Sequence, residues 1–219
     1  EAADVILTDD NFATIVSAVE EGRRIYDNIL KAIQFLLSSN IGEIVVLFTA
    51  ILLTPFLMTT FGIPDAYVNA LEPLLPVQIL WINLVTDSLP ALALAVDPAQ
   101  KGIMKRKPLK TKGIFTKGMT WRVLYQGVMV GGLTLAAFVL GLSTEGVTPE
   151  EKIHIAQTMA FATLALSELV HVFNVKDSKR SIFSSNPFNN SKLVLAILGS
   201  AALMMVVLFV PALQEIFSI

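Results

Sequence analysis

Long uncharged runs divide most of the chain into five segments of mainly apolar residues. Alone or with its flanks, each can form a helix of about 20 residues, the length that crosses a hydrocarbon core of ~30 Å. Backbone groups in lipid must be paired, and no alternation of strands and turns is present, so the pattern predicts helices rather than a barrel. The expected spans are residues 38–62, 74–96, 121–143, 153–175 and 191–212. The chain is expected to be an all-α membrane protein.

A different pattern precedes the first span. Between residues 11 and 37, apolar side chains recur near the helical period with charged residues between them, which is typical of an amphipathic helix. No proline interrupts residues 11–52, so one helix of about 40 residues would reach ~60 Å, twice the bilayer core. We therefore expect a long cytosolic stalk helix at 11–37 that continues into a transmembrane domain at 38–219. Residues 1–10 suit a strand and a helix N-cap that end a cytosolic domain.

The charges of the connecting segments predict how the spans are oriented. Residues 98–122 contain eight Lys and Arg and no acidic residue, and residues 176–192 contain four basic residues and one Asp. Residues 64–72 contain two acids and no base, and residues 145–152 contain three acids and one Lys. Because Lys and Arg stay in cytosolic loops, the first pair of segments is expected in the cytosol and the second pair outside it. The N-terminus is then cytosolic in an integral, multi-pass membrane protein.

Composition excludes several other classes of function. Hydrophobic residues make up 54% of the 219 residues and charged residues only 16%, which is not typical of a soluble domain. The basic and acidic residues are too evenly balanced, at a net charge of −2, for a nucleic-acid-binding protein, so no nucleic-acid partner is expected. The expected partner is the lipid bilayer. The absence of Cys and the presence of only two His exclude a zinc finger and a thiol nucleophile.

Three acidic residues lie inside the apolar segments: Glu43, Asp87 and Glu168. A carboxylate at mid-membrane costs at least a few kcal/mol, and no Lys or Arg lies in the apolar runs to pair with these three. A proton or a bound cation must therefore neutralise them. Helix-breaking residues adjoin two of them, since Gly42 precedes Glu43 and Pro90 follows Asp87 by three residues and is expected to kink the helix near position 86.

Oxygen-bearing side chains accompany these acids at helical spacing. Asn40 precedes Glu43 by one turn, with Ser39 nearly alongside, and Asn83, Thr86 and Asp87 occupy positions i, i+3 and i+4. Oxygen donors without nitrogen or sulfur suit dehydrated Ca²⁺ better than Mg²⁺ or Zn²⁺. The predicted ligands are Asn40, Glu43, Asn83, Thr86, Asp87 and Glu168. Taken singly, Asn, Ser and Thr in membrane helices are more often interhelical hydrogen-bond partners than metal ligands, and His171 is better explained by capping or pairing with Glu168 than by metal binding.

Several motifs resemble one family along the whole chain. The stretch AADVILTDDNFATIVSAVEEGRRIYDNI resembles the end of the phosphorylation domain and the stalk of P-type cation-transporting ATPases. SSNIGE resembles the fifth membrane helix of that family, PVQILWINLVTDSLPALAL the sixth and ALSELVHVFN the eighth. The chain is most similar to the C-terminal membrane half of the endoplasmic-reticulum type of calcium pump and its bacterial relatives. The resemblance implies that the five spans are helices five to nine of the family's ten.

The resemblance implies that the same six residues are calcium ligands, because each matches an ion ligand of the family. It implies that the counterpart of Asp87 bridges two ion sites, and that a fourth helix absent from this chain completes the second. Sodium–potassium pumps typically have Asp at the position of Asn83 and Pro at that of Gly42, and other calcium pumps lack an acid at Glu43 or Glu168. These departures favour a two-ion calcium pump. Residues 54–75 form a longer connection than the family leads us to expect.

The resemblance also implies a mechanism for the intact protein. ATP and Mg²⁺ act in cytosolic domains of the missing N-terminal half, which also carry the phosphorylated Asp, so this fragment is expected to be inactive as an enzyme alone. Its share would be to bind Ca²⁺, release it and take up protons in exchange. The membrane would be the plasma membrane if the protein is bacterial and an internal membrane otherwise. The alternatives are a pump for another cation such as Mn²⁺ or Na⁺, and a non-catalytic channel or receptor fragment.

Overall fold

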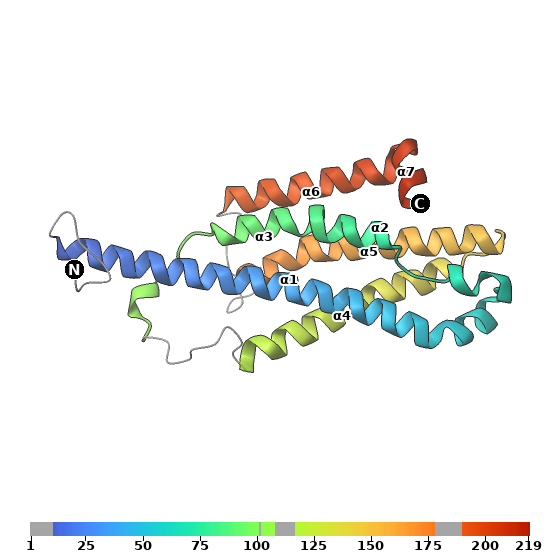
Figure 1. Cartoon of the computed structure of the whole chain (residues 1–219), viewed down its shortest axis with the longest axis horizontal. Helices are drawn as coiled ribbons and strands as arrows, with labels where there is room; N and C mark the ends of the chain where they lie inside the picture. The colour runs from blue at the N-terminus through green and yellow to red at the C-terminus, as the bar shows by residue number, and fades with distance from the viewer. Residues whose placement is uncertain (1–10, 101, 108–116, 178–189) are drawn as a thin grey trace, which may run out of the picture.

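The computed structural model describes residues 11–100, 102–107, 117–177 and 190–219, which form an elongated helical bundle without strands (Figure 1). The predicted end of a cytosolic domain at 1–10 lies outside the described residues. Two short 3₁₀ turns, η1 (Asp65–Ala70) and η3 (Ile103–Lys105), and a π-helical turn, η2 (Ile82–Thr86), interrupt the α-helices. The α-helices are α1 (Phe12–Phe61), α2 (Pro76–Trp81), α3 (Ser88–Ala95), α4 (Lys117–Leu142), α5 (Pro149–Lys176), α6 (Ser191–Phe209) and α7 (Pro211–Phe217).

The long N-terminal helix is present and exceeds its predicted length. Asn11 is its N-cap, with a side-chain oxygen that accepts a hydrogen bond from the Ala13 N–H at 3.0 Å. The helix runs for 50 residues, passes through Pro55 and ends at Gly62, whose φ of 63° is the left-handed conformation that glycine adopts without strain. At about 1.5 Å per residue it is about 75 Å long, so it extends well beyond one bilayer core.

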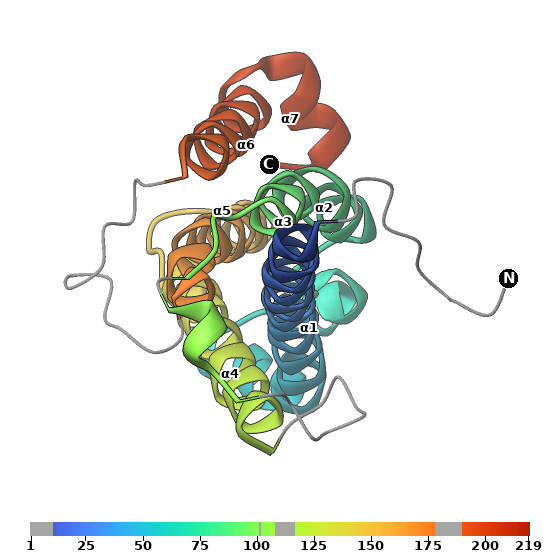
Figure 2. The same cartoon turned by 90° about the vertical axis from the view of Figure 1, so that its left-hand side faces the viewer.

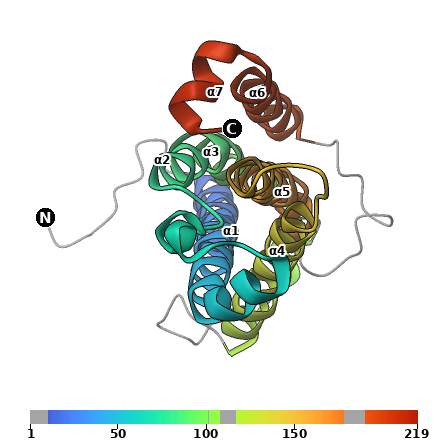
Figure 3. The same ribbon diagram turned by 90° about the vertical axis from the view of Figure 1, so that its right-hand side faces the viewer.

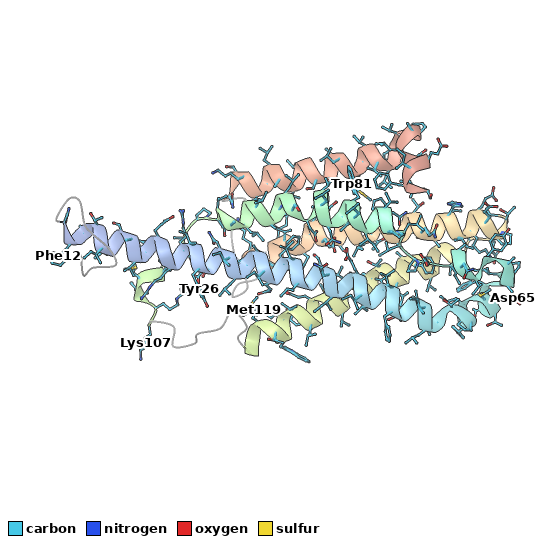
Figure 4. The ribbon with its side chains drawn as sticks, in the orientation of Figure 1. Phe12, Tyr26, Asp65, Trp81, Lys107 and Met119 are labelled. Atoms are coloured by element: carbon cyan, nitrogen blue, oxygen red, sulfur yellow. The ribbon has the colours of Figure 1, made fainter. Side chains whose placement is uncertain are left out.

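Among the residues that the structure describes, five helices are long and apolar enough to cross a membrane, as the sequence predicted. They are Phe12–Phe61, Pro76–Ala95, Gly118–Leu142, Pro149–Lys176 and Ser191–Phe209. The second of these is assembled from α2, η2 and α3. Large apolar side chains are exposed along the outer faces of the bundle, which is what lipid contact requires. The basic segment at Lys107 and the acidic turn at Asp65 lie at opposite ends of the molecule (Figure 4).

Helix packing places α1 against α4, α4 against α5, and α3 between α1 and α6 (Figures 2 and 3). After Pro211, α7 turns back toward α2, where the Phe217 ring meets Trp81 edge-on at 5.3 Å between centroids. Phe217 also stacks on Phe161 of α5 at 6.0 Å. This aromatic group fixes the C-terminal end of the described chain to the α2 end of the bundle.

Gly42 lies within regular helix, so the structure corrects its prediction as a helix breaker. Its role is close packing, because a Cβ on Gly42 would lie 3.3 Å from the Val130 side chain and 3.4 Å from the Gly127 carbonyl of α4. On α4, a Cβ on Gly131 would lie 2.8 Å from the Gly42 carbonyl. Small residues let two membrane helices approach with their backbones nearly in contact, so Gly42 together with Gly127 and Gly131 of α4 allows the close approach of α1 and α4.

Candidate cation site

The helix that carries Asp87 departs from α geometry at η2. The Asp87 N–H bonds to the carbonyl of Ile82, five residues back, at 2.9 Å. Pro90 has no N–H for the Thr86 carbonyl, and the Ser200 hydroxyl of α6 lies 3.4 Å from that oxygen as a substitute donor. The departure expected near residue 86 is therefore a π-helical turn, a feature that occurs often at functional sites.

A layer of polar side chains crosses the bundle at the depth of η2. It lies between a larger apolar cluster, which includes Val46, Ile82 and Ala165, and a smaller one, which includes Phe35, Ala91 and Val172. On each helix the polar residues fall between a member of the first cluster and a member of the second. We call this set the polar layer: Ser39, Glu43, Asn83, Thr86, Asp87, Glu168 and Ser200.

The three predicted carboxylates all belong to the polar layer and are buried: Glu43 is 5% exposed, and Asp87 and Glu168 are 0% exposed. Glu43 has a neutral partner, since the Asn83 amide donates to its Oε1 at 2.7 Å. Asp87 lies within electrostatic range of both other carboxylates. None of the ion pairs among the described residues involves any of the three.

Six buried oxygens of the polar layer have no hydrogen-bond partner in the described structure. They are Ser39 Oγ, Thr86 Oγ1, both carboxylate oxygens of Asp87 and both of Glu168. Ser39 also lies close to Asp87 and Glu168, but in no well-formed hydrogen bond with either. A buried polar group without a partner costs about 1–3 kcal/mol, and more when it is charged. These six oxygens are therefore free to bind protons or a cation that takes several oxygen ligands.

The carboxylates are neighbours without forming a closed metal site. Within the part of the chain that the structure describes, no three His, Cys, Asp or Glu side chains are arranged so that they could hold one metal ion together. Glu43 accepts a hydrogen bond from Asn83, and no hydrogen bond joins it to the oxygens of Asp87. Simultaneous coordination by all three carboxylates would require their side chains to rearrange.

Asn40 lies apart from the other five predicted ligands. It is on an exposed face of α1, where its amide donates to the Leu36 carbonyl of its own helix at 2.7 Å. Its neighbour Ser39 is fully buried and faces the carboxylates. The signal in the sequence was the run of small residues Ser38, Ser39 and Gly42, which share the buried stripe of α1 with Glu43.

Two further polar residues have roles that the sequence did not indicate. Ser200 joins the polar layer from α6, and it is the one hydroxyl residue between residues 193 and 210 of the sequence. His171 bonds through Nε2 to the Ser38 hydroxyl at 2.9 Å. The partner of His171 is thus a serine of α1, where pairing with Glu168 was expected.

Comparison with known proteins places this bundle in a family. Residues 71–219 match the protein family described as "Cation transporting ATPase, C-terminus". A calcium-transporting ATPase of Bacillus subtilis is 46% identical over 218 residues, which cover 99% of this chain and 22% of the relative. The endoplasmic reticulum calcium ATPase srcA of Aspergillus fumigatus is 36% identical over 245 residues, which cover 100% of this chain and 24% of the relative. The chain thus spans less than a quarter of the length of these two relatives. With five span-forming helices and this match, the chain is a multi-pass membrane protein that belongs to the cation-transporting ATPase family and corresponds to its C-terminal part.

Proposed function

We propose that this chain is the membrane transport part of a P-type calcium-transporting ATPase and holds Ca²⁺ in the polar layer. The observation that carries the proposal is the set of six unpartnered oxygens around Asp87, buried among apolar helices. A divalent cation would supply the positive charge that the three buried carboxylates lack, since no ion pair of the described residues involves them. The names of the Bacillus and Aspergillus relatives support calcium as the ion.

The donor chemistry favours calcium over other divalent ions. Carboxylate, amide and hydroxyl oxygens are all present in the polar layer, and Ca²⁺ accepts ~6–8 such ligands in flexible geometry. Mg²⁺ gives up its water reluctantly, and Zn²⁺ prefers nitrogen and sulfur ligands. We assign Glu43, Asn83, Thr86, Asp87 and Glu168 as ligands. Asn40 would join them only if α1 turned about its axis, because in the present structure it faces away.

The emptied site needs a replacement for the ion. Buried carboxylates without a cation are most stable in their neutral form, so we propose that protons bind as calcium leaves and are carried in the opposite direction. The carboxylates must then adopt two arrangements, one that binds calcium and one that binds protons. The hydrogen bond from Asn83 to Glu43 suits the arrangement without calcium.

The stalk part of α1 would connect this site to the energy source. We propose that the end of α1 near Asn11 is cytosolic and that ATP and Mg²⁺ act in the part of the pump that this chain does not include, so the chain alone does not hydrolyse ATP. The stalk carries exposed apolar residues, including Ile15, Val19 and Ile25. We propose that this stripe contacts the remaining part of the pump and passes its movements to Glu43.

The experiment is calcium-dependent phosphorylation by ATP in a full-length pump that carries this chain. Asp87→Asn keeps the shape of the side chain and removes the charge, so we expect the calcium trigger to be lost. The matched control is Asp65→Asn in the exposed η1 turn, which should leave the trigger unchanged. If phosphorylation of the Asp87 variant still depended on calcium, the assignment of Asp87 as the central ligand would be refuted. Phosphorylation triggered by Mn²⁺ or Na⁺ and not by Ca²⁺ would refute calcium as the transported ion.

A further inference from the structure

A second buried polar group lies at the far end of α3 from η2. The Lys31 Nζ of α1 is 2.6 Å from Asp97 Oδ2, and the Asn190 amide donates to Asp97 Oδ1 at 2.9 Å. The Asn28 amide donates to the main-chain carbonyl of Asp97 at 2.7 Å. All four residues are at most 9% exposed. We call this group the Asp97 junction.

The Asp97 junction joins three helices that are far apart in the sequence. Asn28 and Lys31 belong to the stalk side of α1, and Asp97 follows the last turn of α3. Asn190 is the N-cap of α6, where its side-chain oxygen accepts from the Leu193 N–H at 3.1 Å. The same residue thus begins one helix and binds the end of another. Both carboxylate oxygens of Asp97 are used, one by each neighbouring helix.

A buried ion pair is a poor source of stability. The loss of solvation for two charges offsets most of their attraction, and apolar residues of the same size often stabilise a protein equally well. In some proteins such a pair instead fixes the relative position of the elements that carry it. The exposed pair between Arg24 and Glu21 on the same helix has no comparable effect, since both partners are in one helix and in water.

Position matters here because α3 connects the Asp97 junction to the polar layer. Residues 88–95 form an unbroken helix about 12 Å long, and Asp87 and Asp97 lie just before and just beyond its two ends. At its other end α3 continues through the π-helical turn into α2. The junction therefore attaches the end of α3 that is farther from α2 to side chains of α1 and of the α6 N-cap.

We propose that Lys31 and Asp97 are positioning residues that make α3, and with it Asp87, follow the movement of the stalk. This inference rests on the proposed function of the polar layer and adds to it the link through which α1 acts on a carboxylate of another helix. Neither residue touches the ion. Removal of the link should leave the ligands intact and weaken their alignment, so that the effect appears in calcium affinity.

The first test compares variants of the full-length pump. Lys31→Met together with Asp97→Asn removes both charges of the pair. The buried Lys176, which Asp97 attracts and Lys31 repels, loses both influences together, so the pump should fold with a thermal midpoint close to that of the unmodified protein. The calcium concentration for half-maximal phosphorylation should rise by about fivefold or more, the lower range of coupling between sites, while the maximal level stays unchanged. Lys31→Arg keeps the pair and should retain the original calcium dependence, and Glu21→Gln is the control in the same helix. An unchanged half-maximal concentration in the folded double variant would overturn the proposal.

A reversible tether covers the case in which the double variant fails to fold. Cys introduced at positions 31 and 97, in a background otherwise free of Cys, can be bridged by a bifunctional thiol reagent that reaches as far as the lysine–aspartate pair; this chain contributes no Cys of its own. Bridging should restore calcium affinity, and cleavage of the bridge should lower it again in the same sample. Equal affinity in both states would overturn the proposal. If the unmodified pump responds to another cation, calcium is wrong as the ion, and the same comparison with that cation still tests the link.

Discussion

The substitution Gly127→Ala tests whether close backbone contact holds α1 to α4 beside the polar layer. A Cβ at this position would lie 2.5 Å from Ile41 Cγ2, 2.7 Å from Ile41 Cβ and 2.9 Å from the Ser38 carbonyl. Ordinary van der Waals contact begins at 3.4 Å, so the shortest contact must lengthen by about 0.9 Å. Rotation of the Ile41 side chain cannot relieve this, because its Cβ and the backbone oxygen of Ser38 are also too close.

The expected magnitude follows from two opposing effects. Excess volume in a packed interface costs about 1–3 kcal/mol. Alanine is a better helix former than glycine by up to about 1 kcal/mol, which offsets part of that. Gly132→Ala is the matched control, because it lies on the same helix and a Cβ there would meet nothing within 4 Å. It shares the gain in helix propensity without the clash, so the difference between the two variants, about 1–3 kcal/mol, isolates the contact.

The assay is thermal unfolding of the purified full-length pump in detergent at one scan rate, with calcium half-saturation measured alongside. Gly127→Ala should lower the thermal midpoint relative to Gly132→Ala. It should also weaken calcium binding, because Ser38 lies next to Ser39 of the polar layer and moves with it. Equal midpoints for the two variants would refute the reasoning that α1 and α4 are held by contact at Gly127.

Three further substitutions test single features of the structure. Pro90→Ala returns an N–H to the Thr86 carbonyl and favours a regular helix, so calcium half-saturation should weaken several-fold; an unchanged value would mean that the π-helical turn is not needed for binding. Ser200→Ala removes the substitute donor to that carbonyl and should lower the free energy of unfolding by about 1 kcal/mol, as read from the thermal midpoint. The double variant Ser200→Ala and Pro90→Ala should recover this loss, because the N–H of residue 90 then bonds to the carbonyl. Thr148→Ala removes the capping box with Glu151 that begins α5 and should cost about 1 kcal/mol, and an unshifted unfolding curve would contradict the capping role.

Much of the fold could be predicted from the sequence, because the forces that decide it act locally. Bilayer thickness converts an apolar run into a helix of known length, and Asn11 caps α1 through a bond to its own second neighbour. The same local reasoning found Glu43, Asp87 and Glu168, since a carboxylate in an apolar run stands out without any knowledge of its neighbours. The effect of Pro90 on the helix before it was also predictable, because a missing N–H acts only one turn away.

Only the tertiary structure decided which faces of the helices meet. Helical spacing placed Asn40 and Ser39 equally near Glu43, but the approach of α5 and of the helix that carries Asp87 buries Ser39 and leaves Asn40 exposed. The same packing gives Gly42 its role in contact with α4, and it brings Lys31 and Asp97 together across 66 positions of sequence. A chain determines its helices by what each residue prefers within a few neighbours. Which of those residues share a site depends on the rotation of each helix about its axis, and this is set by side chains from helices distant in the sequence.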